Sequence, residues 1–421
     1  MSSKTKTTAT KEEARPGLVP KLRFPEFREI QGWGIEEVGD LLDESRTPSL
    51  LNDPSRRITV RLHLQGVEHR EHRGTESTES TNNFCRKAGQ FIYGKQNIHK
   101  GAFGIISEQL DGFETSQDLP CFDFKSRCCP QWLYYNFATE AVYGPLELKM
   151  TGTGSKRLNE KTFLSLPIAI PSYPEQQKIA EFLSSVDECM VAQARKVDAL
   201  KTLKKGLMQQ LFPREGETLP RLRFPEFQNA GEWEVQRLDE LARYENGKAH
   251  ENDISENGRY IVVNSKFIST EGEVRKFSNE GFCVADEGDV LMVLSDVPNG
   301  RAIAKCYFVE SDDLYTVNQR ICRIQPTKVN GRFLFYVLDR NSYFLDFDDG
   351  IKQTNLRKED VVGFPLCVPP QPDEQQRIAD CLTSLDDLIA VQTQKLEALK
   401  THKKGLMQQL FPSPDTQQIS T

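Results

Sequence analysis

Long apolar runs are missing from this chain. None of its 421 residues lie in a stretch that approaches the roughly 18 apolar residues a membrane-spanning helix needs. Residues 1–16 are polar and lack the apolar segment of a secretory signal. We therefore expect a cytoplasmic protein with a disordered tail over residues 1–19 and a short C-terminal tail over 413–421.

Metal-binding and disulfide patterns are also missing. The ten cysteines include no C-x-x-C pair: Cys128 and Cys129 are adjacent, and the others are scattered among apolar residues. This usage favours reduced, buried thiols over disulfides or zinc ligands. His63, His69 and His72 lie among charged residues that indicate a solvated loop, so no metal is expected.

Catalytic signatures are missing as well. The chain has no H-E-x-x-H, no G-x-S-x-G, no glycine-rich cofactor loop and no Asn/Asp-Pro-Pro-Tyr/Phe run of an adenine methyltransferase. Asp123 with Glu147 and Lys149 resembles a nuclease D…E-x-K set, but such triplets arise by chance and the second half of the chain has no equivalent. We expect no catalytic residue and no cofactor.

An excess of positive charge is missing too. The net charge is −7, from 54 Lys and Arg against 61 Asp and Glu. A protein that only grips phosphates is usually basic. Any contact with nucleic acid must therefore depend on local patches, or on a partner that carries positive charge.

What the sequence does contain is a repeat of about 200 residues, which is too long for a solenoid unit of roughly 20–50 residues. Trp33 and Trp233 also match, six residues after the first motif in each copy. Three motifs recur: Pro20–Phe27 as Pro220–Phe227, Glu175–Ala180 as Glu374–Ala379, and Lys204–Pro213 as Lys403–Pro412. Two whole domains are therefore duplicated, with conserved ends and diverged middles.

Each copy combines a variable globular region with a proline-bounded strand and a long helix. The strands are expected at Leu166–Pro171 and Phe364–Pro369. The predicted fold is mixed α/β (α+β): two globular domains joined by two long antiparallel helices that form a coiled-coil spacer. The expected boundaries are globular domains at 20–173 and 214–371 and helices at 174–213 and 372–412.

The helices show apolar residues at alternating spacings of three and four, which is a heptad seam. The seam positions are Leu183, Val186, Met190, Gln193, Val197, Leu200, Lys204, Leu207 and Leu211, repeated as Leu382, Leu385, Ile389, Gln392, Leu396, Leu399, Lys403, Leu406 and Leu410. A helix from Glu175 to Phe212 is roughly 57 Å long at 1.5 Å per residue. Antiparallel packing of the two helices is the simplest arrangement; the alternative is that each packs only on its own globular domain.

From Pro20 to Pro412 these motifs resemble the specificity subunit of type I restriction-modification systems. The resemblance rests on two variable domains, each followed by a helix that opens on E-Q-Q-[K/R]-I-A and closes on K-K-G-L-M-Q-Q-L-F-P. It implies a non-catalytic subunit that binds double-stranded DNA, with one target-recognition domain for each half of a split, asymmetric site. It also implies two methyltransferase (modification) subunits, joined by restriction/translocase subunits.

The duplication itself agrees with a two-copy partner, because near-identical helices offer near-identical docking surfaces. Two unlike heads on a rigid spacer likewise predict a bipartite site whose gap the helices set. The candidate methyltransferase-docking residues are Glu175, Gln176, Gln177, Glu374, Gln375 and Gln376.

In the first variable region three segments carry side chains that suit phosphates and base edges. Ser55–His63 alternates polar and apolar residues as a strand would, Tyr93–Lys100 reads as a polar loop, and Gly152–Arg157 reads as a phosphate-contacting turn without NTP-site spacing. A solvated strand face and a plain surface turn are the alternatives. The candidates are Arg57, Arg61, His63, Lys95, Gln96, Asn97, Lys100, Ser155, Lys156 and Arg157.

In the second variable region the corresponding loops are Ser295–Arg301 and Gly350–Asn355. Asn and Gln pair with adenine and Arg with guanine. The candidates are Lys248, Asn264, Lys266, Ser295, Asn299, Arg301, Lys352, Gln353 and Thr354. The stretch from Glu245 to Glu310 holds seven Lys/Arg against twelve Asp/Glu, so this domain should grip phosphates poorly unless its acids point away.

Two alternatives stay open at this stage. One is a protein–protein scaffold without DNA contact, which differs from a DNA reader in having no steep salt dependence of duplex binding. The other is the specificity subunit of a system whose methylation and cleavage activities share one fused partner chain.

Overall fold

The computed structural model describes residues 18–51, 53–71, 83–296, 302–348 and 354–412. The tails expected at 1–19 and 413–421 therefore lie almost entirely outside the described residues. The chain divides into two compact units, Met1–Ala194 with Gln394–Thr421, and Arg195–Thr393. Each unit thus takes one globular region and a part of both long helices.

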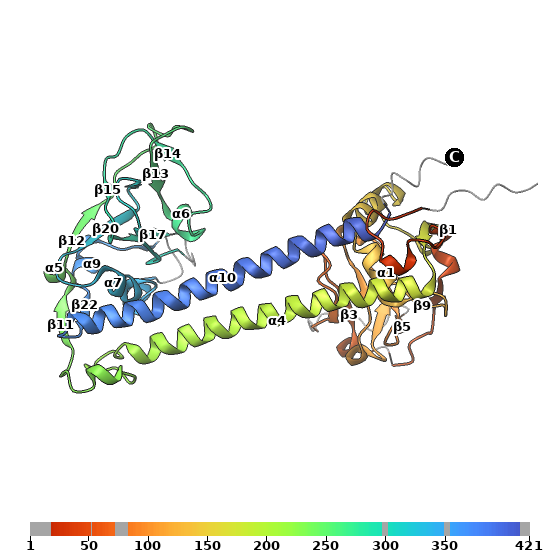
Figure 1. Ribbon diagram of the computed structural model, residues 1–421, viewed down its shortest axis with the longest axis horizontal. Helices are drawn as coiled ribbons and strands as arrows, with labels where there is room; N and C mark the ends of the chain where they lie inside the picture. The colour runs from red at the N-terminus through yellow and green to blue at the C-terminus, as the bar shows by residue number, and fades with distance from the viewer. Residues whose placement is uncertain (1–17, 52, 72–82, 297–301, 349–353, 413–421) are drawn as a thin grey trace, which may run out of the picture. The chain divides into compact units, whose positions relative to one another are not determined.

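The first unit is built on an antiparallel sheet in the order β2-β9-β6-β7, of which Figure 1 labels β9. Three two-stranded pairs accompany it: β1 with β10, β3 with β4, and β5 with β8. The strands are β1 (Gly34–Glu37), β2 (Leu42–Ser45), β3 (Ile58–Val60), β4 (Val67–His69), β5 (Asn83–Cys85), β6 (Phe91–Tyr93), β7 (Phe103–Ile105), β8 (Glu114–Ser116), β9 (Cys121–Phe124) and β10 (Pro167–Ile170). The helices are η1 (Pro25–Phe27), η2 (Val38–Asp40), η3 (Pro54–Arg56), η4 (Ile98–Lys100), η5 (Glu108–Leu110), α1 (Pro130–Phe137), α2 (Glu140–Tyr143), η6 (Gly144–Lys149) and α3 (Glu160–Leu164).

The second unit repeats this framework and enlarges it. Its antiparallel sheet β12-β20-β16-β18 matches the first unit's sheet strand for strand, and β11 pairs with β22 as β1 pairs with β10. A further sheet, β14-β13-β19-β15, has its own apolar core, and β17 pairs with β21. The strands are β11 (Glu234–Arg237), β12 (Ala242–Asn246), β13 (Tyr260–Val263), β14 (Phe277–Ser278), β15 (Val284–Ala285), β16 (Val290–Val293), β17 (Ser295–Asp296), β18 (Cys306–Phe308), β19 (Tyr315–Val317), β20 (Ile321–Pro326), β21 (Thr354–Asn355) and β22 (Pro365–Val368). The shorter helices are η7 (Pro225–Phe227), α5 (Leu238–Leu241), α6 (Ser265–Ser269), α7 (Gly331–Leu338), α8 (Ser342–Leu345) and α9 (Lys358–Val362).

The two long helices are α4 (Tyr173–Leu211) and α10 (Pro372–Leu410), each of 39 residues. Pro174 and Pro372 lie in their first turns, where a missing N–H costs nothing, and Pro213 and Pro412 follow their ends. The predicted seam is the less exposed face: for example, Leu183, Leu211, Leu382 and Leu410 are at most 1 % exposed. The predictions of the two long helices and of the proline-bounded strands are confirmed.

Within each unit the helix segments run antiparallel, and they also pack on the globular region. In the first unit Leu183 near the start of α4 shares a core with Met407 and Leu410 near the end of α10. In the second unit Leu382 near the start of α10 shares a core with Leu211 at the end of α4. The antiparallel packing predicted from the sequence therefore occurs within each unit, and the alternative, in which each helix packs only on its own globular domain, does not.

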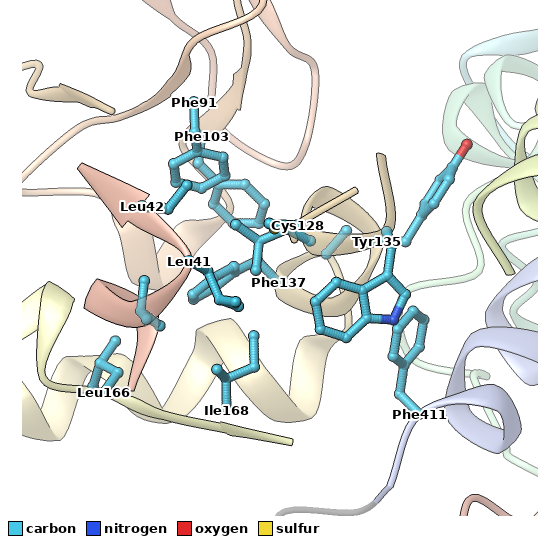
Figure 2. Close-up of a cluster of buried hydrophobic side chains, with 14 of the residues drawn as sticks. Leu41, Leu42, Phe91, Phe103, Cys128, Tyr135, Phe137, Leu166, Ile168 and Phe411 are labelled. Carbon is cyan, nitrogen blue, oxygen red and sulfur yellow. The ribbon is translucent and has the colours of Figure 1, made fainter. Parts of the chain in front are cut away.

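An apolar core joins these parts in the first unit (Figure 2). Phe91 on β6 stacks on Phe163 at 5.8 Å between ring centroids, and Leu41 and Ile168 lie in the same cluster. Phe411, at the far end of the chain, packs edge-on against Trp33 at 6.2 Å. The end of α10 is thus part of the core of the N-terminal domain.

A buried ion pair fixes each long helix to the N-terminal motif of its own copy. In the first unit Arg23 donates to both carboxylate oxygens of Glu175 at 2.9 and 2.8 Å, and Trp33 Nε1 donates to the same carboxylate at 3.1 Å. Arg223, Trp233 and Glu374 form the same cluster in the second unit. The Glu175 carboxylate raises the pKa of Arg23, which keeps the guanidinium charged despite its burial.

A second polar cluster ties the seam lysine to the globular region. Lys403 donates to both oxygens of Asp187 at 2.6 and 2.8 Å, and its Nζ lies 5.0 Å from the centroid of the Tyr135 ring. The Tyr135 hydroxyl donates to Asp187 at 2.8 Å. Lys204, Asp386 and Tyr336 repeat the arrangement in the second unit. Each lysine that interrupts a seam therefore has a carboxylate partner on the other long helix.

The cysteines are free thiols, as predicted, and most of them are buried or half-buried; Cys189 is exposed. Burial raises the pKa of Cys121 and of Cys128 to about 12, so these thiols are protonated and unreactive near neutral pH.

Candidate nucleic-acid interface

The three candidate segments of the first unit meet around η4. His63 N donates to Lys100 O at 2.8 Å, and Leu64 N donates to Gly101 O at 3.0 Å. On the other side of the loop, Leu158 N donates to Lys95 O at 2.9 Å. Segments separated by up to about a hundred residues in sequence are thereby joined into one surface.

Gly101 permits this close approach. It ends η4 with φ of 73°, the left-handed region that favours glycine. A Cβ at this position would meet the Leu64 backbone N at 3.1 Å. The glycine at this position therefore has a local packing reason.

The expected strand carrying Arg57, Arg61 and His63 on one face is wrong. β3 ends at Val60, and His63 and Leu64 have φ of 56° and 59°, so the chain turns there. Arg57 is mostly buried and pairs with Glu114 at 2.9 Å, and Arg61 pairs with Glu68 across the β3–β4 hairpin. The reason is that a tight turn ends the strand and that carboxylates of β4 and β8 pair with the two arginines; His63 stays exposed.

Most cations of the other two segments also have carboxylate partners. Three pairs are formed: Lys95 with Glu160 at 2.7 Å, Arg157 with Asp118 at 3.0 Å, and Lys156 with Glu147 at 3.9 Å. Gln96 and Asn97 are partly exposed, and Ser155 is exposed. Lys100 is exposed and has no ion pair to another residue of the described ranges.

The structure adds Lys149 to this surface. It is exposed at the end of η6, which packs against η4, and it too has no ion pair within the described part of the chain. In the sequence Lys149 drew notice only in a nuclease-like triplet, and Glu147 in fact pairs with Lys156. No local pattern marks Lys149, because its position depends on η6 packing on a loop some fifty residues away.

In the second unit the β17–β21 pair brings the two candidate loops together. Ser295 lies opposite Asn355 and Asp296 opposite Thr354, while Leu356 N donates to Leu294 O at 2.8 Å. Thr354 is buried and its hydroxyl donates to Asp348 at 2.7 Å. Ser295 is also buried. Asn299, Arg301, Lys352 and Gln353 lie outside the described residues.

The turn between β19 and β20 connects the remaining candidates to this pair. Lys248 N donates to Val317 O at 2.9 Å, and Asn318 N donates to Val263 O, next to Asn264, at 3.0 Å. Leu294 N donates to Arg320 O at 2.9 Å. Arg320 is exposed on this turn. Sequence reasoning did not select it, because no nearby motif indicates that this turn contacts several candidate segments.

Asn264 and Lys266 have different local roles. The Asn264 side chain caps α6 by accepting from Phe267 N at 2.9 Å, which gives this residue a structural function. Lys266 and Lys248 are exposed. Some of the acidic side chains of this unit are paired within it: Arg323 forms ion pairs with Asp286 and Asp289.

Four of the six expected docking residues are not on the surface. Glu175, Gln176 and Glu374 are 1 % exposed and Gln375 is 5 % exposed. The two glutamates bind the arginines of the N-terminal motifs, as described above. Gln176 accepts from Cys129 N and donates to Pro171 O, and Gln375 makes the matching bonds to Asn330 N and Pro369 O. The prediction for these four is wrong because the motif holds each helix to its domain.

Gln177 and Gln376, the other two docking candidates, are exposed. In the first unit Gln177 lines a shallow groove between α1 and α4, together with Cys129, Gln131, Glu181, Ser184 and Glu188. In the second unit Asn330 donates to Gln376, and Gln376 donates to Asp380, both at 2.7 Å.

Two kinds of feature are absent from the described part of the chain. No described helix is long and apolar enough to cross a membrane. Among the same residues, no group of three or more His, Cys, Asp or Glu side chains is placed to hold a metal ion.

Known proteins share this organisation. The family profile described as type I restriction modification DNA specificity domain matches twice, over residues 35–202 and 230–401. The MjaVIII specificity subunit of a type I restriction enzyme from Methanocaldococcus jannaschii is 25 % identical over 297 residues, covering 66 % of this chain and 69 % of its own length. The putative MjaX specificity subunit of the same organism is 22 % identical over 300 residues, with 68 % of each chain covered.

Solved structures share the fold. A type I restriction-modification S subunit from M. genitalium superposes with a TM-score of 0.57 at 14 % identity, covering 94 % of this chain and 99 % of that one. A chain from a study of complex assembly in a type I restriction-modification system gives 0.56 at 16 % identity, covering 90 % and 97 %. Because the family profile covers most of the chain in two copies, this protein belongs to the type I restriction-modification DNA specificity family.

Proposed function

We propose that this chain is the sequence-recognition subunit of a type I restriction-modification complex, with each unit reading one half of a bipartite, asymmetric DNA site. One observation carries the proposal. The same backbone junction, Leu158 to Lys95 in one unit and Leu356 to Leu294 in the other, presents loops of unlike sequence. A shared frame with different loops is what two different half-sites require.

The long helices are proposed to set the gap between half-sites. Support comes from their equal lengths and from the repeated Lys–Asp contacts, which allow one antiparallel register in each unit. Polar residues at core positions are a known means of specifying register in coiled coils. The domain boundaries expected from the sequence remain part of this proposal.

The same helices are proposed to dock two methyltransferase subunits, with restriction subunits joining the complex, and the chain itself is proposed to be non-catalytic. The exposed face beside Gln177, with Glu181 and Glu188, replaces the buried glutamates as the docking candidate in the first unit. The matching face in the second unit lies around Gln376 and Asp380. DNA as the target implies a cytoplasmic protein.

The experiment that tests the proposal is modification mapping. The chain is co-expressed with its methyltransferase partner, and methylated adenines are located across the host genome. We expect a split, asymmetric motif, and replacing residues 244–363 with those of a relative should change one half and leave the other intact. Changes in both halves, or in neither, would contradict the assignment of one half-site to each unit.

The cations without ion pairs provide a direct test of the interface. Replacing Lys100 or Lys149 with Ala should weaken binding about equally for all duplex sequences, because phosphate contacts carry no base information. Each substitution should reduce the slope of log K against log salt by about 1. The measurement is a salt titration of the complex by fluorescence anisotropy. The control is Lys178→Ala, a lysine of α4 that pairs with Glu26 and lies over the Phe24 ring, away from η4 and η6 in the chain.

Unchanged affinity and an unchanged salt slope in both variants would remove η4 and η6 from the interface. If the unaltered complex shows no salt-dependent binding to duplex DNA, a protein scaffold is favoured over a DNA reader.

A further inference from the structure

One turn occupies the same backbone position in both units and carries opposite charges in them. It comprises Ser116–Leu119 before β9 and Asn318–Ile321 at the start of β20. In both turns the N–H of the fourth residue donates to the carbonyl of the first, at 3.1 Å and 2.9 Å respectively. The third residue of the turn is Asp118 in the first unit and Arg320 in the second.

Strand register establishes that these two positions are equivalent. Asp118 lies four residues before the β9 residue that pairs with the first residue of β6. Arg320 lies four residues before the β20 residue that pairs with the first residue of β16. The backbone contacts agree, because Lys95 N donates to Asp118 O at 3.0 Å and Leu294 N donates to Arg320 O at 2.9 Å.

Both turns lie where the candidate segments of their unit meet. The residue that donates to the turn also accepts from the second candidate segment of its unit. In the first unit Lys95 O accepts from Leu158 N, and in the second Leu294 O accepts from Leu356 N. Position 118 or 320 is therefore one backbone contact away from the junction on which the proposed function rests.

The turn of the second unit is held from a further side. Lys248 N donates to Val317 O, directly before the turn, at 2.9 Å. A Cβ at Gly247 would overlap the Asn318 carbonyl oxygen, so only glycine allows this approach. The backbone at Arg320 is thus fixed by contacts with two separate segments.

The side chains at the two positions differ in their partners. The Asp118 carboxylate pairs with Arg157 at 3.0 Å. Arg320 is exposed and forms no ion pair with any residue that the structure describes. An exposed arginine alone means little. Several other arginines of this acid-rich unit do have carboxylate partners, namely Arg223, Arg259, Arg323 and Arg332.

The charge reversal distinguishes a base contact from a phosphate contact. A phosphate contact favours a cation in both units, because the DNA backbone carries the same charge in every half-site. A base contact allows either sign, because guanine presents the acceptors O6 and N7 whereas cytosine presents the donor N4. Asp118 and Arg320 in one backbone position therefore favour the reading of bases.

We infer that Arg320 donates two hydrogen bonds, to O6 and N7 of a guanine in the half-site of the second unit. The inference rests on the proposed DNA-reading function and names a specificity-determining residue for it. The guanidinium group is a planar fork of donors that matches these two acceptors, and a turn held in place presents it in one position.

Replacement of guanine by 7-deazaguanine, in which C–H takes the place of N7, tests the inference. Each guanine of the mapped site is replaced in turn, and the affinity of each duplex for the complex of this chain with its methyltransferase is measured. The exchange of residues 244–363 identifies the half-site of the second unit. The unaltered complex should lose about tenfold in affinity at one guanine of that half-site.

Three variants make the test specific to the guanidinium group. Arg320→Ala should remove the difference between guanine and 7-deazaguanine in this half-site and leave the other half-site unchanged. Arg320→Lys keeps the charge but not the fork, so it should keep the salt slope and lose most of the difference. Arg243→Ala, at an exposed arginine opposite Gln325 toward the other end of the β12–β20 pair, is the matched control and should change neither quantity.

We expect these variants to fold, because the Arg320 side chain is exposed and its backbone carbonyl still accepts from Leu294 N in each of them. The inference is overturned if the half-site of the second unit has no sensitive guanine, or if its sensitivity survives Arg320→Ala or is kept in full by Arg320→Lys.

The remaining outcomes separate this inference from the proposed function. If Arg320→Ala weakens all duplexes equally and reduces the salt slope by about 1, the residue contacts phosphate and the guanine contact is refuted. If modification mapping gives a split motif whose guanines do not depend on Arg320, the proposed function stands and only the inference is wrong. If mapping gives no split motif, the proposed function itself is wrong.

Discussion

Replacing Glu175 with Ala should lower the free energy of unfolding by about 3–5 kcal/mol, because removal of one partner of a buried ion pair leaves the other charge unpaired. The side chains of Arg23 and Glu175 are 5 % and 1 % exposed. Trp33 Nε1 also loses its acceptor in this variant. Equilibrium unfolding in urea measures the change.

Two comparisons make this prediction specific. Gln177→Ala, an exposed position two residues further along α4, should change the free energy of unfolding by no more than about 0.5 kcal/mol. Glu374→Ala should be as costly as Glu175→Ala, because Arg223 and Trp233 surround Glu374 in the same way. A loss below about 1 kcal/mol in both glutamate variants would show that the cluster does not hold the helix to its domain.

Asp187→Ala should cost about 2 kcal/mol, because Lys403 and Tyr135 both lose the acceptor of a charge-assisted hydrogen bond. The expected effect is smaller than at Glu175, since the Asp187 side chain is 36 % exposed and water can replace part of the loss. Thermal or urea unfolding measures it, with the exposed Glu188→Ala as the matched control.

Lys403→Met probes the purpose of the same cluster. Removal of the cation leaves the Asp187 carboxylate without its partner, so the free energy of unfolding should fall, by about 1–2 kcal/mol because this carboxylate is 36 % exposed. Apolar residues at both positions should recover part of that loss, but without the polar pair that specifies register. A double-mutant cycle between Asp187→Ala and Lys403→Met should give a coupling of about 0.5–3 kcal/mol; a value near zero would refute the pairing.

Much of the fold follows from the sequence because its signals are local and periodic. The seam spacing and the bounding prolines predict α4 and α10, and the proline-bounded apolar runs predict β10 and β22. The duplication, and with it the expectation of two unlike readers on one framework, needs no coordinates.

The candidate site follows from the sequence only in part. The sequence identifies the polar loops but not which of their cations are neutralised: Arg57, Lys95 and Arg157 pair with carboxylates from distant segments. It also misplaces the E-Q-Q motif. A charged, repeated motif indicates a surface, yet Glu175 is buried because Arg23 lies 152 residues earlier in the chain and reaches it.

Sequence alone determined that this protein has two copies of one framework, with long seam-bearing helices and different loops in each copy. Tertiary structure alone decided that the repeated glutamates Glu175 and Glu374 form buried ion pairs, that Lys403 pairs with Asp187, and that η6, which carries Lys149, packs on η4, which carries Lys100. The physical reason is that periodicity and propensity act between near neighbours. Ion pairs and loop contacts join residues that only the folded chain brings together.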